Sequence, residues 1–267
     1  MKKDKQENRK EKREKREDRN QTVGEEVANA VTHGVGAVLA IACLVIAVAF
    51  AALRRDVWSV VSVSIYGACM FILYLCSTLY HAVMTPRAKA VLNIFDHATI
   101  YLLIAGSYTP FCLAGIRNYS PGWAWSIFGV VWLFAVLGII FQSLFVNKYQ
   151  AFSNATYLLM GWIVLIAIYP LWKAMGTTAV LWIAAGGIAY SLGVIFYVMK
   201  SKKYMHAIWH LFVLAGTLIH YGVVLYYIAL GYGKGKDEIQ NMKDEIQAPT
   251  SEISYLESEI YNLESNI

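Results

Sequence analysis

The sequence predicts an all-α integral membrane protein with seven transmembrane helices, and three observations support this. The chain of 267 residues is 58% hydrophobic. Its charges gather toward the two ends, so that between Arg54 and Gly231 only Asp56 and Asp96 are acidic. The long middle portion divides into seven apolar runs of about 20 residues or more, the length that a helix needs to cross a bilayer. A water-soluble core does not show this distribution, whereas a multi-pass membrane protein does.

The N-terminal segment is a charged tail that precedes the membrane domain. Residues 1–21 hold ten of the 23 Lys and Arg residues, together with six acidic ones. Basic residues beside a first span favour the cytoplasmic side, so we predict a cytoplasmic N-terminus. The net charge of +5 is then explained by topology and by contact with anionic lipid, and no nucleic-acid partner is predicted.

The membrane domain is predicted over residues 22–233, as seven spans separated by short charged gaps. The expected spans are 27–52, 58–81, 92–114, 122–145, 153–172, 178–199 and 205–231. We expect helices, because backbone groups in lipid must bond within the segment and these runs lack the alternation of membrane strands. With seven spans and the N-terminus inside, the C-terminus is extracellular. The four cysteines lie within the apolar runs without a CxxC pair, so no disulfide framework is predicted.

The C-terminal segment, residues 234–267, differs in character from the membrane domain. Its apolar residues fall on alternating three- and four-residue steps, the seam of a coiled coil, interrupted by Pro249. Two interpretations compete: a native tail through which chains oligomerise, or a foreign segment fused to the membrane domain. We favour the fusion, because the composition switches abruptly from membrane helix to acidic coiled coil.

Histidines carry the main functional signal. All six lie in or at the ends of the predicted spans, where ionisable groups are costly and usually functional. In the predicted topology five of them share one membrane depth with Asp96, the single acid within a span: His33, His81, His97, His206 and His210. His206 and His210 are four residues apart, so they share a helix face and can reach one ion. This pattern predicts a metal site, and zinc is the ion that suits imidazole ligands.

A histidine from a second helix would complete a three-histidine site whose fourth position is open, as in catalytic zinc sites. His81 is the favoured third ligand, because Ser77 lies one helical turn before it and could bond a ligand, a carboxylate or the bound water. Asp96 is the expected general base or hydrogen-bond acceptor beside the metal. His97 projects about 100° away from Asp96 on a helix and is not expected to be a ligand. His220 is expected to form a hydrogen bond between helices.

The first predicted span carries polar residues of its own. Three of them share one helix face at roughly one-turn steps: Glu26, Asn29 and His33. Their expected place is near the metal site, at the same membrane depth.

Four segments, taken in order, resemble the hemolysin III family of bacterial membrane proteins: EEVANAVTHG, STLYH, NIFDHATIYLLIAGSYTP and HAIWHLFVLAGTLIHY. That family is grouped with the progestin and adiponectin receptors, and more distantly with alkaline ceramidases. The resemblance covers roughly residues 22–231. It implies a seven-helix fold with zinc near the cytoplasmic side, held by a water and three histidines: His81, His206 and His210. It places Ser77 and Asp96 beside the metal, and it matches the family's first-span motif to Glu26, Asn29 and His33. The heptad tail has no counterpart in the family pattern, which supports a fused segment.

The resemblance also implies a function, because the relatives are regarded as zinc-dependent hydrolases of lipid amides such as ceramides. The leading hypothesis is a zinc hydrolase of a membrane-lipid amide or ester, in which Asp96 accepts a proton and Ser77 orients water or steadies the oxyanion. The alternative is a non-catalytic receptor or membrane-homeostasis sensor with structural zinc, in which Asp96 could be a fourth ligand. A pore-forming haemolysin fits seven full spans less well.

Overall fold

The computed structural model describes residues 21–146 and 148–232, so the predicted heptad tail and all but the last residue of the predicted charged tail lie outside it. The described residues form helices and no strand. The α-helices are α2 (Val23–Leu53), α3 (Val57–Ala82), α4 (Pro86–Pro110), α5 (Pro121–Phe145), α6 (Gln150–Gly161), α7 (Ile168–Tyr197) and α8 (Met205–Val223). Two of them continue as π-helices, α4 into η1 (Phe111–Ile116) and α8 into η3 (Val224–Ala229), and a short 3-10 turn, η2 (Ile163–Leu165), follows α6.

Local sequence signals explain where several helices begin. At α2, Thr22 and Glu25 form a capping box, in which each side chain bonds the backbone N–H of the other residue. At α3, the carboxylate of Asp56 accepts hydrogen bonds from the backbone N–H groups of Trp58 and Ser59. The helices α4 and α5 each begin with a proline, which needs no hydrogen-bond partner for its nitrogen in the first turn.

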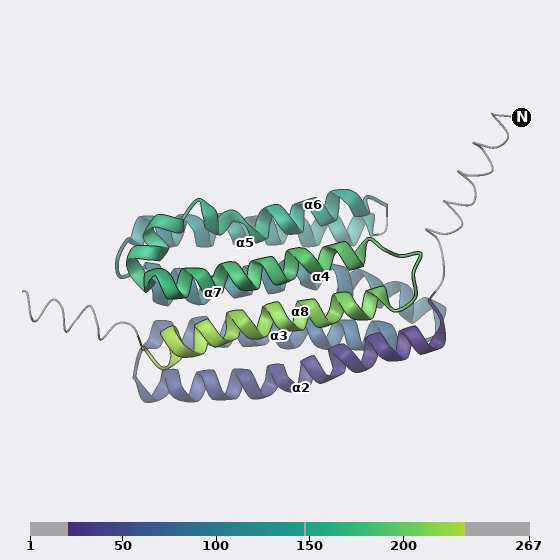
Figure 1. The fold of residues 1–267 in the computed structure, drawn as a ribbon, viewed down its shortest axis with the longest axis horizontal. Helices are drawn as coiled ribbons and strands as arrows, with labels where there is room; N and C mark the ends of the chain where they lie inside the picture. The colour runs from purple at the N-terminus through teal and green to yellow at the C-terminus, as the bar shows by residue number, and fades with distance from the viewer. Residues whose placement is uncertain (1–20, 147, 233–267) are drawn as a thin grey trace, which may run out of the picture. The chain divides into compact units, whose positions relative to one another are not determined.

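The helices lie side by side and run alternately in opposite directions (Figure 1). The helix α2 packs against α3 and α8, α3 packs against α4, and α7 packs against α8. Close packing of α2 on α3 depends on Gly36, where a Cβ atom would lie 2.7 Å from the Tyr74 ring. Because helices that follow one another in the chain run in opposite directions, the start of α2, the end of α3 and the start of α8 meet at one end of the bundle (Figure 1).

The bundle has an apolar outer surface and carries many of its polar side chains inside. Val38, Leu144 and Leu159 on the outer faces of three helices are 68%, 69% and 71% exposed. By contrast, serine, threonine, asparagine and four of the six histidines are found among the buried residues. Six of the described helices are long and apolar enough to cross a membrane. This distribution is that of a multi-pass membrane protein, whose outer face is solvated by lipid.

The predicted span at 153–172 is not one continuous helix in the structure, and the prediction was wrong on this point. It consists of α6, η2 and the first turns of α7, which are joined to the rest of α7 at Gly176. Gly176 has a φ of 79°, a conformation that favours glycine. Trp162 Nε1 donates to Ser191 Oγ at 3.0 Å, and Trp172 Nε1 donates to Thr177 Oγ1 at 2.9 Å. The segment before Gly176 therefore lies antiparallel to the segment after it.

A tyrosine from α4 satisfies the backbone at the interruption. The hydroxyl of Tyr108 donates to the carbonyl of Gly161 at 2.7 Å, with the carbonyl of Met160 at 3.1 Å. The same oxygen accepts from the backbone N–H of Val164 at 2.9 Å. Backbone groups freed by a helix break are tolerated at membrane depth only where the protein supplies other partners, and Tyr108 supplies them here.

Candidate metal centre

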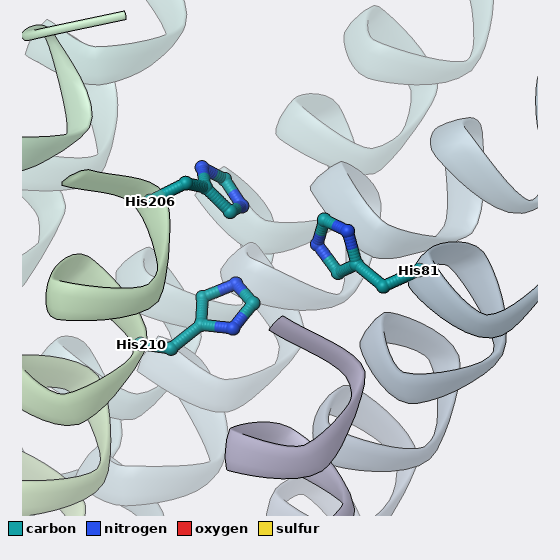
Figure 2. Close-up of side chains that lie close together, drawn as sticks. All are labelled: His81, His206 and His210. Atoms are coloured by element: carbon teal, nitrogen blue, oxygen red, sulfur yellow. The ribbon is translucent and has the colours of Figure 1, made fainter. Parts of the chain in front are cut away.

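Three histidines from two helices come together at the end of the bundle where α3 finishes and α8 begins. His81 lies in the last turn of α3, and His206 and His210 lie in the first two turns of α8. One ring nitrogen from each falls within 4.8 Å of the other two. Figure 2 shows the paired rings of α8 facing the ring of His81 across a small gap. Among the described residues this is the one group of histidine, cysteine or carboxylate side chains close enough to share an ion.

The ring of His81 is held by a carboxylate from α2. His81 Nδ1 donates to Glu26 Oε2 at 2.7 Å, and the other oxygen of Glu26 pairs with Lys89 Nζ at 3.0 Å. A carboxylate cannot donate a hydrogen when ionised, so the proton of a neutral His81 ring is on Nδ1. The remaining nitrogen, Nε2, is buried and has no hydrogen-bond partner. A carboxylate that orients a histidine in this way is typical of zinc sites.

The ring of His210 is held in the same manner by the backbone of α2. Its Nδ1 lies 3.3 Å from the carbonyl oxygen of Asn29 and 3.2 Å from Thr32 Oγ1. Since a carbonyl only accepts, Nδ1 carries the hydrogen and Nε2 is left as the ligand atom. His206 Nε2 is also buried without a partner. A tetrahedral zinc ion needs nitrogens about 3.4 Å apart, so small inward movements of the rings would complete the site.

The three first-span residues lie beside the histidine cluster, all on one buried face of α2. Glu26 and Asn29 contact His81, the second through a 3.4 Å approach of Nδ2 to Nδ1. His33 stacks on His210 with a centroid distance of 3.5 Å and an interplanar angle of 12°. Both nitrogens of His33 are buried and unpartnered. This face of α2 therefore lies beside the cluster, and Glu26 and Asn29 have defined contacts with His81.

A cavity of about 120 Å³ opens beside the cluster, lined mostly by apolar residues of α3, α4, α6, α7 and α8. At its cluster end it is lined by Ser77 and Asp96 as well as by His206 and His210. Ser77 is 1% exposed and its hydroxyl has no partner. The carboxylate of Asp96 lies on the cavity wall and is not among the ligand atoms that cluster. The structure thus brings both predicted catalytic residues to the cavity that His206 and His210 line.

The other two histidines lie outside the cluster. His97 Nδ1 donates to the carbonyl of Asn93 at 2.9 Å, and its Nε2 lies 3.3 Å from the hydroxyl of Tyr197. His220 Nε2 donates to the carbonyl of Ile183 at 2.9 Å and links α8 to α7, which confirms the expected bond between helices.

Sequence reasoning missed a contact that sets the start of α8. Tyr204 precedes α8 with a φ of 61°, and its backbone N–H donates to Glu25 Oε1 at 2.9 Å. The other oxygen of Glu25 accepts from Thr22, so one carboxylate joins the start of α2 to the start of α8. The spacing of Thr22 and Glu25 is a capping-box signal, but nothing in the sequence indicated Tyr204 as a partner. Lys89, the partner of Glu26, was also missed.

Comparison with known proteins agrees with these features. Residues 21–221 match the family described as Haemolysin-III related. The chain is 42% identical over 208 residues to Hemolysin-3 of Bacillus cereus, covering 78% of this chain and 94% of that relative. It is 42% identical over 206 residues to the Hemolysin-3 homolog of Bacillus subtilis (strain 168), covering 77% and 95%. It is also 31% identical over 215 residues to the monocyte to macrophage differentiation factor of Homo sapiens, covering 78% and 86%.

The matched region covers α2, α3 and all but the last two residues of α8. It includes the first-span face, the Ser77 and His81 pair, Asp96 and the two histidines of α8. On this agreement of sequence and architecture, the chain belongs to the Haemolysin-III related family of membrane proteins.

Proposed function

We propose that this protein is an integral-membrane zinc hydrolase that cleaves an amide or ester of a membrane lipid. The observation that carries the proposal is a set of unpartnered, buried ring nitrogens at the head of an apolar cavity. His81 Nε2 and His206 Nε2 have no hydrogen-bond partner, although buried polar atoms are normally satisfied. A metal ion bound by these nitrogens, together with His210, would account for them.

The donor set fits zinc, which imidazole nitrogens bind well and which three histidines leave with an open position. When bound there, zinc would polarise a carbonyl and lower the pKa of a coordinated water to about 7. Asp96, on the cavity wall, is proposed to accept the proton of the attacking water. Ser77, whose hydroxyl has no partner in the protein, is proposed to orient that water or to donate to the developing oxyanion.

The cavity favours a lipid as the ligand. Leucine and isoleucine side chains of α3, α4 and α6 line it, and polar groups gather at the cluster end. A lipid chain placed against this apolar wall would carry its amide or ester group to the histidines.

We further propose seven membrane crossings, with the N-terminus and the histidine cluster on the cytoplasmic side of the cell membrane. Six crossings are the long apolar helices, and the seventh is the interrupted segment from α6 to Gly176, which lies antiparallel to the rest of α7. The ten basic residues before Gln21 support the orientation.

A second candidate is a non-catalytic receptor or membrane sensor in which zinc has a structural role. One observation favours it: the cluster and its partners join α2, α3, the start of α4 and α8, so an ion there would tie together segments from both ends of the membrane domain. In that case Asp96 would contact the molecule bound in the cavity without accepting a proton from water.

Metal analysis followed by a hydrolysis assay tests both candidates. The purified wild-type chain is expected to hold about one zinc ion per chain, and the double variant His206→Ala, His210→Ala is expected to hold none. Wild type is then compared with Asp96→Asn for cleavage of a long-chain acyl amide and a ceramide in mixed micelles. Asp96→Asn is expected to retain zinc and to lose at least about 100-fold in rate, since general-base catalysis contributes about 10²- to 10⁴-fold.

The matched control is Ser107→Ala, a change on the same cavity wall outside the cluster, which is expected to retain most of the activity. Equal rates for wild type and Asp96→Asn would remove Asp96 from catalysis. Stoichiometric zinc without cleavage of either substrate would favour the receptor, and zinc retained by the double variant would show that the ligands are misassigned.

A further inference from the structure

The cavity beside the histidine cluster continues toward the middle of the bundle and ends at His220. The main cavity of about 120 Å³ and an adjoining one of about 40 Å³ share part of their walls, including Tyr108, Trp162 and His220. His220 follows His210 by ten residues on the same helix, which places it about 15 Å farther along α8. A single water needs only about 10–15 Å³ of such space, so the cavity has room for a chain of atoms.

The ring of His220 carries an acceptor that nothing in the described protein satisfies. The residue is 9% exposed, and its Nε2 donates to the carbonyl of Ile183. Because that carbonyl can only accept, Nε2 holds the hydrogen, and in the neutral ring Nδ1 is a bare acceptor. Nδ1 is buried and has no hydrogen-bond partner. Leaving a polar atom unpaired at this depth is costly, and an apolar side chain would fill the same space without that cost.

The ring is also held in place from its other sides. A Cβ atom at Gly186 would lie 2.2 Å from Cδ2 and 2.4 Å from Nε2 of His220, so α7 approaches the ring as closely as a glycine allows. The Tyr190 ring meets it edge-on, with a centroid distance of 5.6 Å. The position of Nδ1 is therefore set by packing before any ligand arrives.

The other polar side chains on the wall common to both cavities already have partners. The hydroxyl of Ser107 donates to the carbonyl of Ile104 at 2.8 Å. The hydroxyl of Tyr108 bridges the break after α6, and Trp162 Nε1 donates to Ser191. Among the described residues on this shared wall, His220 is the one with a buried polar atom that has no hydrogen-bond partner at all.

We propose that the inner end of the cavity is a second recognition site, at which His220 Nδ1 accepts a hydrogen bond from a hydroxyl group on the chain of a bound lipid. The lipid class that fits is an amide or ester with a hydroxyl about 15 Å from the group at the histidine cluster. The inference rests on the proposed function only in taking a lipid amide or ester as the occupant, because hydroxyl recognition itself needs neither zinc nor cleavage.

Binding to the full chain after removal of zinc with a chelator tests the inference. The probes are ω-hydroxyacyl amides and alkanoyl amides of matched chain length, in a graded series, competing with a fluorescent acyl amide in detergent micelles. In wild type, the hydroxyl probe is expected to bind about 3- to 10-fold tighter than its alkanoyl partner at the length that spans the cavity. At shorter lengths the preference is expected to disappear, because the hydroxyl no longer reaches His220.

His220→Gln is the diagnostic variant, because its amide N–H can keep the bond to Ile183 while the acceptor at the Nδ1 position is lost. It is expected to abolish the hydroxyl preference, whereas Ser107→Ala on the same wall is expected to keep it. Absence of a preference in wild type at every length would overturn the inference, without need of any variant. Loss of the preference in Ser107→Ala and its retention in His220→Gln would also overturn it, by assigning the acceptor to Ser107.

The outcome is distinguishable from that of the proposed function. A hydroxyl preference in a chain that cleaves no lipid would leave this recognition site standing and remove the hydrolase. Cleavage of a lipid without any hydroxyl preference would leave the hydrolase standing and remove this recognition site.

Discussion

The two ends of the cavity are built in different ways. At the cluster end, three histidines from α3 and α8 are surrounded by polar residues of α2 and α4, and two of the rings are fixed through Nδ1 by groups on α2. At the inner end, one histidine lies against the rings of Phe111 on η1 and Tyr190 on α7 and bonds a backbone carbonyl of α7. The cluster end therefore presents several ring nitrogens to one point, whereas the inner end presents a single hydrogen-bond acceptor.

This difference shows what each end can bind. An ion requires several ligands that are held in place by further hydrogen bonds, and only the cluster end has them. A single hydroxyl requires one acceptor and a close-packed wall, which the inner end provides. The same residue type therefore serves two kinds of recognition, and the number of helices that contribute polar groups decides which.

The largest expected effect tests whether the cluster end depends on a charge from α2. In Glu26→Gln, zinc affinity is expected to fall about 10- to 100-fold, or up to about 2.7 kcal/mol, because the carboxylate no longer orients His81. Competition with a chelator of known zinc affinity measures the change. His97→Gln, on the same cavity wall, should shift the affinity less than twofold. An unchanged affinity in Glu26→Gln would mean that His81 is oriented by other groups.

An intermediate effect is expected at the inner end, where packing and not charge fixes the ring. Gly186→Ala would place a methyl group against His220, so the free energy of unfolding is expected to drop by about 1–2 kcal/mol with zinc content unchanged. Gly129→Ala in α5 is the matched control, because no atom lies within 4 Å of the place that its added methyl group would take; a neutral or slightly stabilising effect is expected there. Thermal unfolding in detergent compares the two. Equal stability of both variants would show that the inner end is loosely packed.

The smallest expected effect concerns the layer between the two ends. The hydroxyl of Tyr74 donates to Thr217 Oγ1 at 2.8 Å, and Tyr190 meets the same oxygen at 2.7 Å. In Tyr74→Phe the loss is expected to be about 0.6 kcal/mol, since hydrogen bonds between membrane helices contribute about that much on average. The same unfolding assay measures it, and a loss above about 2 kcal/mol would mean that this network, more than the two ends, holds α3 against α8.

Much of the site could be predicted from the sequence because it depends on helical spacing. The four-residue steps from Ser77 to His81 and from His206 to His210 place each pair on one face, and alternating spans return them to one membrane depth. The length of each apolar run likewise predicted where the long helices lie, because it too depends only on the local sequence. Both signals are local and periodic, and the structure has the corresponding helices.

The parts that could not be predicted depend on contacts between distant residues. The run GWIVLIAIYP is typical of continuous membrane helix, yet the chain breaks there because the Tyr108 hydroxyl on α4 replaces the missing backbone bonds. Hydropathy does not detect such a substitution, since the broken segment is as apolar as an intact one. The pairing of Glu26 with Lys89 likewise joins α2 to the start of α4 and has no periodic signal.

The order of biosynthesis gives the cluster a further consequence. Glu26 and His81 are 55 residues apart and can meet early, but the Asn29 carbonyl and its partner His210 are 181 residues apart. At about 5–20 residues per second, the ribosome needs roughly 10 to 35 seconds to add the 181 residues from Asn29 to His210. During that interval the hydroxyls of Tyr66 and Tyr74 on α3, which donate to Thr217 of α8 in the complete fold, would lack this partner inside the membrane. Arrival of α8 is thus the step that completes the polar interior, and a nascent chain stalled before it would carry a feature that quality-control proteases could recognise.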